Sequence, residues 1–124
     1  MAKKVLVVED EPELVKALEL RLKTQDYEVI TAFDGEEGLR KAREENPDLI
    51  ILDLMLPKMD GFKVSRMLKF DDSHKHIPII MLTAKSERED EELGKETGAD
   101  EYITKPFEWE HLAARVKKHL GEEE

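Results

Sequence analysis

Residues 49–61 read Leu-Ile-Ile-Leu-Asp-Leu-Met-Leu-Pro-Lys-Met-Asp-Gly, an apolar run that leads into a carboxylate and then into turn-forming residues. Because the run has no polar alternation, it predicts a strand that is covered on both faces, as parallel strands are. Asp53 stands where this strand ends, and open α/β sheets bind their ligands outside that end. The stretch therefore predicts an α/β fold with a carboxylate placed for chemistry.

Composition limits the classes of protein that fit. The 124 residues suffice for one domain, which we expect over 1–120 with a solvated tail at 121–124. The formal charge of -10 argues against direct binding of nucleic acid. The chain has no cysteine, which excludes thiolate catalysis and cysteine-based zinc sites. The apolar run at 5–8 is too short for a signal peptide or a membrane span, so we expect a cytoplasmic protein without membrane contact.

The remaining pattern alternates short apolar runs with amphipathic segments. Strands are expected at 5–8, 28–32, within the 49–61 stretch, at 79–82 and at 101–104, and helices at 12–25, 36–45, 61–70 and 107–120. A highly charged segment at 86–97 carries one large apolar residue, Leu93, so a helix there would be barely anchored. Five strands that alternate with helices predict a doubly wound (βα)5 fold with a parallel sheet.

Polar side chains follow four of these strands. Glu9 and Asp10 follow the first, Asp53 ends the third, and Thr83 and Lys105 follow the fourth and fifth. Each residue alone fits a helix cap or an exposed loop, but the carboxyl ends of parallel strands meet at one edge. Three carboxylates together require a cation, and oxygen ligands suit Mg²⁺. A lysine and a hydroxyl beside them suit a phosphoryl group, with Asp53 as the nucleophile.

Four spaced motifs carry a resemblance to the receiver domain of bacterial two-component response regulators. They are Val5-Leu6-Val7-Val8-Glu9-Asp10-Glu11, the 49–61 stretch, Leu82-Thr83-Ala84, and Gly98-Ala99-Asp100-Glu101-Tyr102-Ile103-Thr104-Lys105-Pro106-Phe107. Four motifs in order are more specific than a single glycine-rich loop, and they cover essentially the whole chain. The resemblance implies a flavodoxin-like, five-stranded parallel sheet of order 2-1-3-4-5.

The resemblance also implies a function, that of a phosphoprotein in a two-component phosphorelay. A sensor histidine kinase would transfer a phosphoryl group to Asp53 with Mg²⁺, and the aspartyl phosphate would signal to a downstream protein or a fused output domain. The chain would then be no enzyme beyond slow self-dephosphorylation. The implied Mg²⁺ ligands are Asp10, Asp53, the backbone carbonyl of Met55 and, through water, Glu9.

The phosphoryl group would be held by Thr83, Ala84 and Lys105, with a cis bond between Lys105 and Pro106. Thr83 and Tyr102 resemble the switch pair of the family: Thr83 would move to the phosphoryl oxygen, and Tyr102 would fill the space that it leaves. We expect the 86–97 segment to reorder with the fifth strand, since sparsely anchored elements are the ones that switch.

Two departures from the family qualify these expectations. Asp100, Glu101 and Arg115 match the dimer face of DNA-binding members. Three residues of the 86–97 segment do not match that face: Glu91, Glu92 and Lys95. We therefore expect a largely monomeric unphosphorylated protein.

Met55 and Lys85 follow Asp53 and Thr83 by two residues. A thioether cannot orient an attacking water and a long cation can block it, so hydrolysis of the phosphate is expected to be slow.

Two other classes of protein share parts of this pattern. Aspartyl-phosphate phosphatases also use an aspartate at a strand end, but they place a second aspartate where this chain has Met55, and they add a cap domain. A nucleotide- or flavin-binding module would fit the same fold, yet the sequence has neither Gly-x-Gly-x-x-Gly nor a P-loop.

Overall fold

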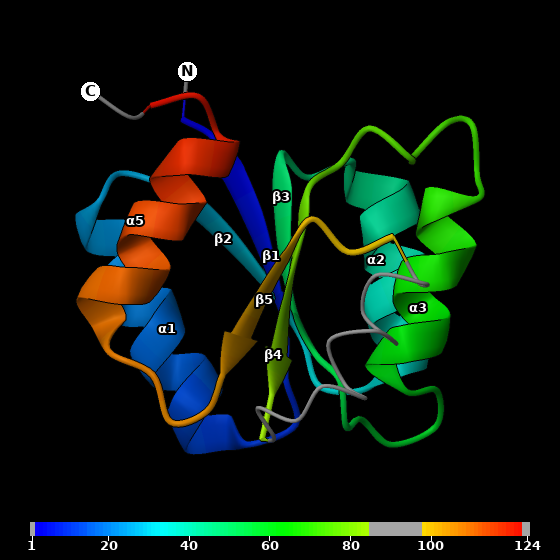
Figure 1. Ribbon diagram of the computed structural model, residues 1–124, viewed down its shortest axis with the longest axis horizontal. Coiled ribbons are helices and arrows are strands. Elements are labelled where there is room, and N and C mark those ends of the chain that lie inside the picture. Colours follow the sequence, from blue (N-terminus) through cyan, green and yellow to red (C-terminus); the bar gives the residue numbers. More distant parts are fainter. Residues whose placement is uncertain (1, 85–97, 123–124) are drawn as a thin grey trace.

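The computed structural model describes residues 2–84 and 98–122 and contains one parallel sheet of order β2-β1-β3-β4-β5. The predicted doubly wound sheet and its strand order are confirmed (Figure 1). Each expected strand is present, with bounds within one residue of the prediction. The strands are β1 Lys4–Val8, β2 Glu28–Ala32, β3 Leu49–Asp53, β4 Ile79–Thr83 and β5 Glu101–Thr104.

Helices cover both faces of the sheet. Helices α1 and α5 lie on one face, and α2 and α3 lie on the other (Figure 1). The last of them begins two residues later than expected, because Glu108 is still extended, with φ -87° and ψ 139°. The bounds are α1 Pro12–Thr24, α2 Gly35–Glu45, α3 Gly61–Lys69 and α5 Trp109–His119.

Strand β3 is the centre of the core, as its unbroken apolar run predicted. Leu49 and Ile51 pack into the cluster on the α1/α5 face, whereas Ile50 and Leu52 pack into the cluster on the α2/α3 face. All four side chains are fully buried, and each contributes roughly 2 kcal/mol of hydrophobic stabilisation. Because β3 is held on both faces, the position of Asp53 at its end is fixed.

The turn between β3 and α3 closes tightly beneath Asp53. The Gly61 N–H donates to the Leu54 carbonyl over 2.9 Å, and the Gly35 N–H donates to the Pro57 carbonyl over 3.2 Å. Asp60 caps α3 by accepting from the Lys63 N–H over 2.8 Å. A Cβ atom on Gly61 would overlap the carbonyl oxygen of Asp53. The turn is therefore a packed support for the end of β3.

Edge strand β5 is tied to α5 through Glu101. Its Oε1 accepts from Arg115 Nη2 at 2.6 Å and from Nε at 3.0 Å, and His119 Nε2 lies 3.0 Å from the same oxygen. Burial by itself raises the pKa of Glu101, but the hydrogen bonds and charges of His119 and Arg115 outweigh it and hold the pKa below its ordinary value. Glu101 and Arg115, which match residues of the dimer face of DNA-binding members, are thus paired with each other within one chain.

We expect this pairing to make a pH-dependent contribution to stability. A carboxylate whose pKa is lower in the folded state stabilises the fold above its unfolded pKa, which is 4.5 here, and that contribution is lost as the pH falls through the folded value. Glu101→Gln is expected to cost about 1 kcal/mol at roughly pH 5.5 and progressively less as the pH falls below 4.5, measured by urea unfolding against the exposed control Glu36→Gln. A cost that stays constant over this range would contradict the expectation.

The C-terminal end of α5 folds back on the domain. Gly121 has a φ of +72°, and the N–H groups of Gly121 and Glu122 donate to the carbonyls of Lys118 and Lys117. This is a Schellman motif. The hydroxyl of Tyr27 then donates to Glu122 Oε1 over 2.7 Å, so the exposed start of the expected tail contacts the α1–β2 loop.

No helix within 2–84 or 98–122 combines the length and the apolar composition that crossing a membrane would need.

Candidate functional site

Three carboxylates converge at the carboxyl edge of the sheet. Oxygen atoms of Glu9, Asp10 and Asp53 all lie within 4.8 Å of one another. Glu9 is fully buried, Asp53 is 5% exposed, and Asp10 is exposed to solvent. The Glu9 N–H donates to the Ala32 carbonyl over 3.1 Å, which holds the residue after β1 against the end of β2. The convergence follows from the parallel topology, as the sequence predicted.

Lys105 forms ion pairs with the two buried members of this cluster. Its Nζ lies 2.6 Å from Glu9 Oε1, 3.3 Å from Asp53 Oδ2 and 4.0 Å from Glu11 Oε1. The Lys105 N–H donates to the Thr83 carbonyl over 2.6 Å, and the bond to Pro106 is cis. Burial lowers the pKa of Lys105, but the hydrogen bond to Glu9 and the charges of Asp53 and Glu9 more than compensate and raise it. The ammonium therefore stays charged at neutral pH.

Thr83 and Tyr102 extend from neighbouring strands on one face of the sheet. Tyr102 pairs in register with Met81, and both pack toward the α2/α3 cluster. Thr83 follows Met81 by two residues, so it faces the same side, and it is 2% exposed. Asp53 pairs with Leu82, which places Thr83 beside the carboxylate cluster, and Ala84 follows at the surface.

Met55 lies at the rim of the site. The residue is 71% exposed, and its N–H donates to Asp53 Oδ1 over 3.2 Å. The two oxygens of Asp53 therefore have different partners, a backbone N–H and the Lys105 ammonium.

The 86–97 segment, for which a helix was considered, lies outside the described residues. So do four residues that the sequence singled out: Lys85, Glu91, Glu92 and Lys95.

The donor set fits a hard divalent cation. Glu9, Asp10 and Asp53 offer only oxygen, and one of them is open to solvent, which leaves room for water ligands. Within 2–84 and 98–122 no other group of three or more histidine or acidic side chains comes as close together. Lys105 supplies one positive charge against three carboxylates, so the cluster retains the negative charge that attracts such an ion.

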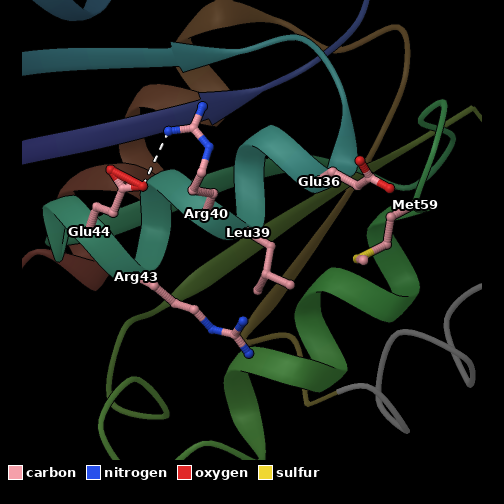
Figure 2. A pocket seen from close by; sticks show the side chains of 6 residues that line it. All are labelled: Glu36, Leu39, Arg40, Arg43, Glu44 and Met59. Carbon is pink, nitrogen blue, oxygen red and sulfur yellow. Dashed lines mark hydrogen bonds and ion pairs between the residues drawn. The ribbon is translucent and has the colours of Figure 1, made fainter.

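Sequence reasoning missed two features of this region. It did not foresee that Lys105 lies closer to Glu9 than to Asp53, because side-chain rotamers leave no trace in the sequence pattern. It also gave no sign of a groove of about 510 Å³ beside α2, whose lining includes none of Glu9, Asp10 and Asp53 (Figure 2). An Arg40–Glu44 ion pair of 3.2 Å lies on its rim. The groove is lined by Glu36, Leu39, Arg40, Arg43, Glu44 and Met59, none of which was expected to act in phosphoryl chemistry.

One curated relative is similar to this chain over its whole length. PhoP of Bacillus subtilis (strain 168), an alkaline phosphatase synthesis transcriptional regulatory protein, is 52% identical over 124 residues, which cover 100% of this chain and 51% of PhoP. The chain thus spans about half the length of that curated relative.

Solved structures of response regulators have a similar fold. Chemotaxis protein CheY4 of Vibrio cholerae has a TM-score of 0.89 at 35% identity, over 95% of this chain and 98% of that chain. The BeF3-activated N-terminal receiver domain of RstA from Klebsiella pneumoniae has a TM-score of 0.87 at 33% identity, over 95% and 98%. The family described as the response regulator receiver domain matches residues 5–117. The chain therefore belongs to the receiver domain family of two-component response regulators.

Proposed function

We propose that this receiver domain is a phospho-accepting switch that takes a phosphoryl group from a sensor histidine kinase onto Asp53 with Mg²⁺. The observation that carries the proposal is the placement of Asp53, a nearly buried carboxylate beside the Lys105 ammonium and two further acidic groups. An ionised aspartate is already a competent nucleophile at neutral pH. The surrounding charges supply what phosphoryl transfer requires, since that reaction depends on positioning and charge stabilisation.

In the proposed reaction, a carboxylate oxygen of Asp53 forms a bond to phosphorus as the bond to the kinase histidine nitrogen breaks. Lys105 stabilises the equatorial oxygens from the side of Glu9, while the Thr83 hydroxyl and the Ala84 N–H donate to the same oxygens. Bound Mg²⁺ would neutralise charge on the phosphoryl group. Glu9, Asp10, Asp53 and the backbone carbonyl of Met55 are the groups that would hold it.

The proposed switch uses the face that Thr83 shares with Tyr102. Movement of Thr83 toward a phosphoryl oxygen would vacate space beside β4, and the half-buried Tyr102 side chain would turn into it. The altered surface would then change binding to a downstream protein or to a fused output domain, such as the additional half of a PhoP-like protein would provide. This domain itself would bind no nucleic acid or membrane and would act in the cytoplasm.

Mass spectrometry of the intact protein after incubation with acetyl phosphate and Mg²⁺ tests this function. Wild type is expected to gain the mass of one phosphoryl group, and Asp53→Ala is expected to gain none. Asp72→Ala, which removes an almost fully exposed carboxylate from the α3–β4 loop, is expected to behave as wild type. Uptake by Asp53→Ala, or none by wild type, would refute the proposal.

Slow loss of the phosphoryl group is expected from the residues that follow Asp53 and Thr83 by two positions in the sequence. The Met55 thioether cannot hold a hydrolytic water, and Lys85 carries a cation two residues after Thr83. Met55→Asn combined with Lys85→Glu is expected to speed dephosphorylation about tenfold or more, because both new groups can orient water. The decay of the phosphorylated mass at constant Mg²⁺ measures it. An unchanged decay rate would disprove this account of Met55 and Lys85.

We expect the unphosphorylated protein to be monomeric. Asp100 is paired with Lys69 at 2.7 Å and Glu101 with Arg115 at 2.6 Å, so these groups have partners inside the chain. Breaking such part-buried pairs to form intermolecular ones would bring little net gain. Sedimentation equilibrium at micromolar concentration is expected to return the monomer mass of about 14.4 kDa. A dimer that persists on dilution would contradict this expectation.

A further inference from the structure

Lys69, the last residue of α3, carries an ammonium that is part of no function described so far. Its side chain is only 12% exposed. Nζ lies 2.7 Å from Asp100 Oδ2, 2.7 Å from the Ile77 carbonyl oxygen and 3.2 Å from the Lys75 carbonyl oxygen. The three N–H bonds of the ammonium thus have three acceptors. A lysine this buried and this fully bonded is an ordered structural group rather than a mobile surface cation.

Asp100, the acidic partner of Lys69, is hydrogen-bonded to the first residue of β4. Asp100 Oδ2 also accepts from the Ile79 N–H over 2.8 Å, and the Asp100 N–H donates to the Ile79 carbonyl over 2.9 Å. Gly98, with a φ of +81°, lets the chain pass close to the Lys69 stem, where a Cβ atom would lie 3.1 Å from Lys69 Cβ. The residue that precedes β5 is therefore joined to both α3 and β4.

Strand β5 needs such a connection more than the other strands do. It has four residues and, among the strands that the structure describes, pairs with β4 alone, from Ile80 opposite Glu101 to Thr83 opposite Thr104. A slip of one residue would turn every β5 side chain to the other face of the sheet. It would take Tyr102 away from the α2/α3 cluster and would carry Lys105 away from Glu9 and Asp53.

We propose that Lys69 and Asp100 are positioning residues that hold β5 in register, so that an ion pair at the amino edge of the sheet places Lys105 at the carboxyl edge. The structural half of this proposal stands alone, and its consequence for phosphoryl binding rests on the proposed function. Neither residue touches the carboxylate cluster. Both act through the four-residue strand that separates Asp100 from Lys105.

The test compares Lys69→Met, Asp100→Asn and the double variant with Lys63→Met, which removes an exposed lysine from the same helix. Asp100→Asn keeps an acceptor for the Ile79 N–H, and it replaces Lys69→Met as the test variant if Lys69→Met does not fold. Amide exchange by NMR follows β5, and titration with beryllofluoride and Mg²⁺ follows phosphoryl binding. We expect β5 amides of Lys69→Met to exchange about tenfold faster while those of β1 and β3 do not change.

Beryllofluoride affinity is expected to fall about tenfold in Lys69→Met, and the double variant is expected to be no worse than that single variant, because the two residues act as one unit. Exchange in β5 that matches Lys63→Met would overturn the proposal. Faster exchange with unchanged affinity would overturn the link to Lys105. If wild type binds no beryllofluoride and takes up no phosphoryl group, the proposed function fails, and the exchange rates alone then decide whether the ion pair holds the register.

Discussion

Lys105→Met is expected to slow phosphoryl uptake from acetyl phosphate about a hundredfold, the usual cost of losing one charge-stabilising group. The methionine keeps most of the apolar stem but removes the ammonium that lies 2.6 Å from Glu9 and 3.3 Å from Asp53. Two nearly buried carboxylates then lose their cation. Without divalent ions the free energy of unfolding is therefore expected to fall by about 3 kcal/mol. Time-resolved mass spectrometry and urea unfolding measure the two effects.

The matched control is Lys58→Met, which removes another lysine at the same edge of the sheet. Lys58 is 62% exposed and pairs with Asp34 over 3.7 Å, so its loss is expected to change neither uptake nor stability measurably. Equal uptake rates in Lys105→Met and Lys58→Met would show that the ammonium does not act on the phosphoryl group.

Gly61→Ala is expected to destabilise the protein by about 3 kcal/mol, although alanine is the better helix former. The added Cβ atom would overlap the Asp53 carbonyl oxygen, and backbone cannot yield as a flexible side chain can. The end of β3 must then shift, so beryllofluoride binding is expected to weaken as well. Urea unfolding and a beryllofluoride titration with Mg²⁺ measure these changes.

Gly38→Ala provides a graded control for this substitution. Its Cβ atom would lie 2.6 Å from Cγ1 and 2.9 Å from Cγ2 of the buried Val8, so it would press on a side chain rather than on backbone. We expect a cost of about 1 kcal/mol and unchanged beryllofluoride binding. If Gly61→Ala were as mild as Gly38→Ala, the close contact beneath Asp53 would not be essential to the site.

Periodicity and strand ends predicted the parts of this molecule that depend on the sheet. The apolar run before Asp53 needs cover on both faces, and that requirement led to the parallel topology and its common edge. Once the edge was known, Glu9, Asp10 and Lys105 had to lie near Asp53. The side chains that meet there could be named because the backbone alone brings them together.

Features that depend on close packing were not predictable in the same way. The turn after β3 contains ordinary turn residues, and nothing in their pattern indicates that Gly61 must fit under Asp53. The bond from Tyr27 to Glu122 joins residues that are far apart in the chain. Likewise, Asp100 resembled a dimer contact in the sequence, whereas in the fold it pairs with Lys69. Such contacts follow from tertiary geometry rather than from local propensity.

The central claim is that Asp53 itself carries the phosphoryl group, and chemical trapping tests it most directly. Borohydride reduces an acyl phosphate to an alcohol, so it converts a phosphorylated aspartate into homoserine, which peptide mass spectrometry can locate. After incubation with acetyl phosphate and Mg²⁺, we predict homoserine at position 53 and at no other aspartate. Homoserine at position 10, or a phosphoryl adduct that borohydride leaves intact, would contradict the account.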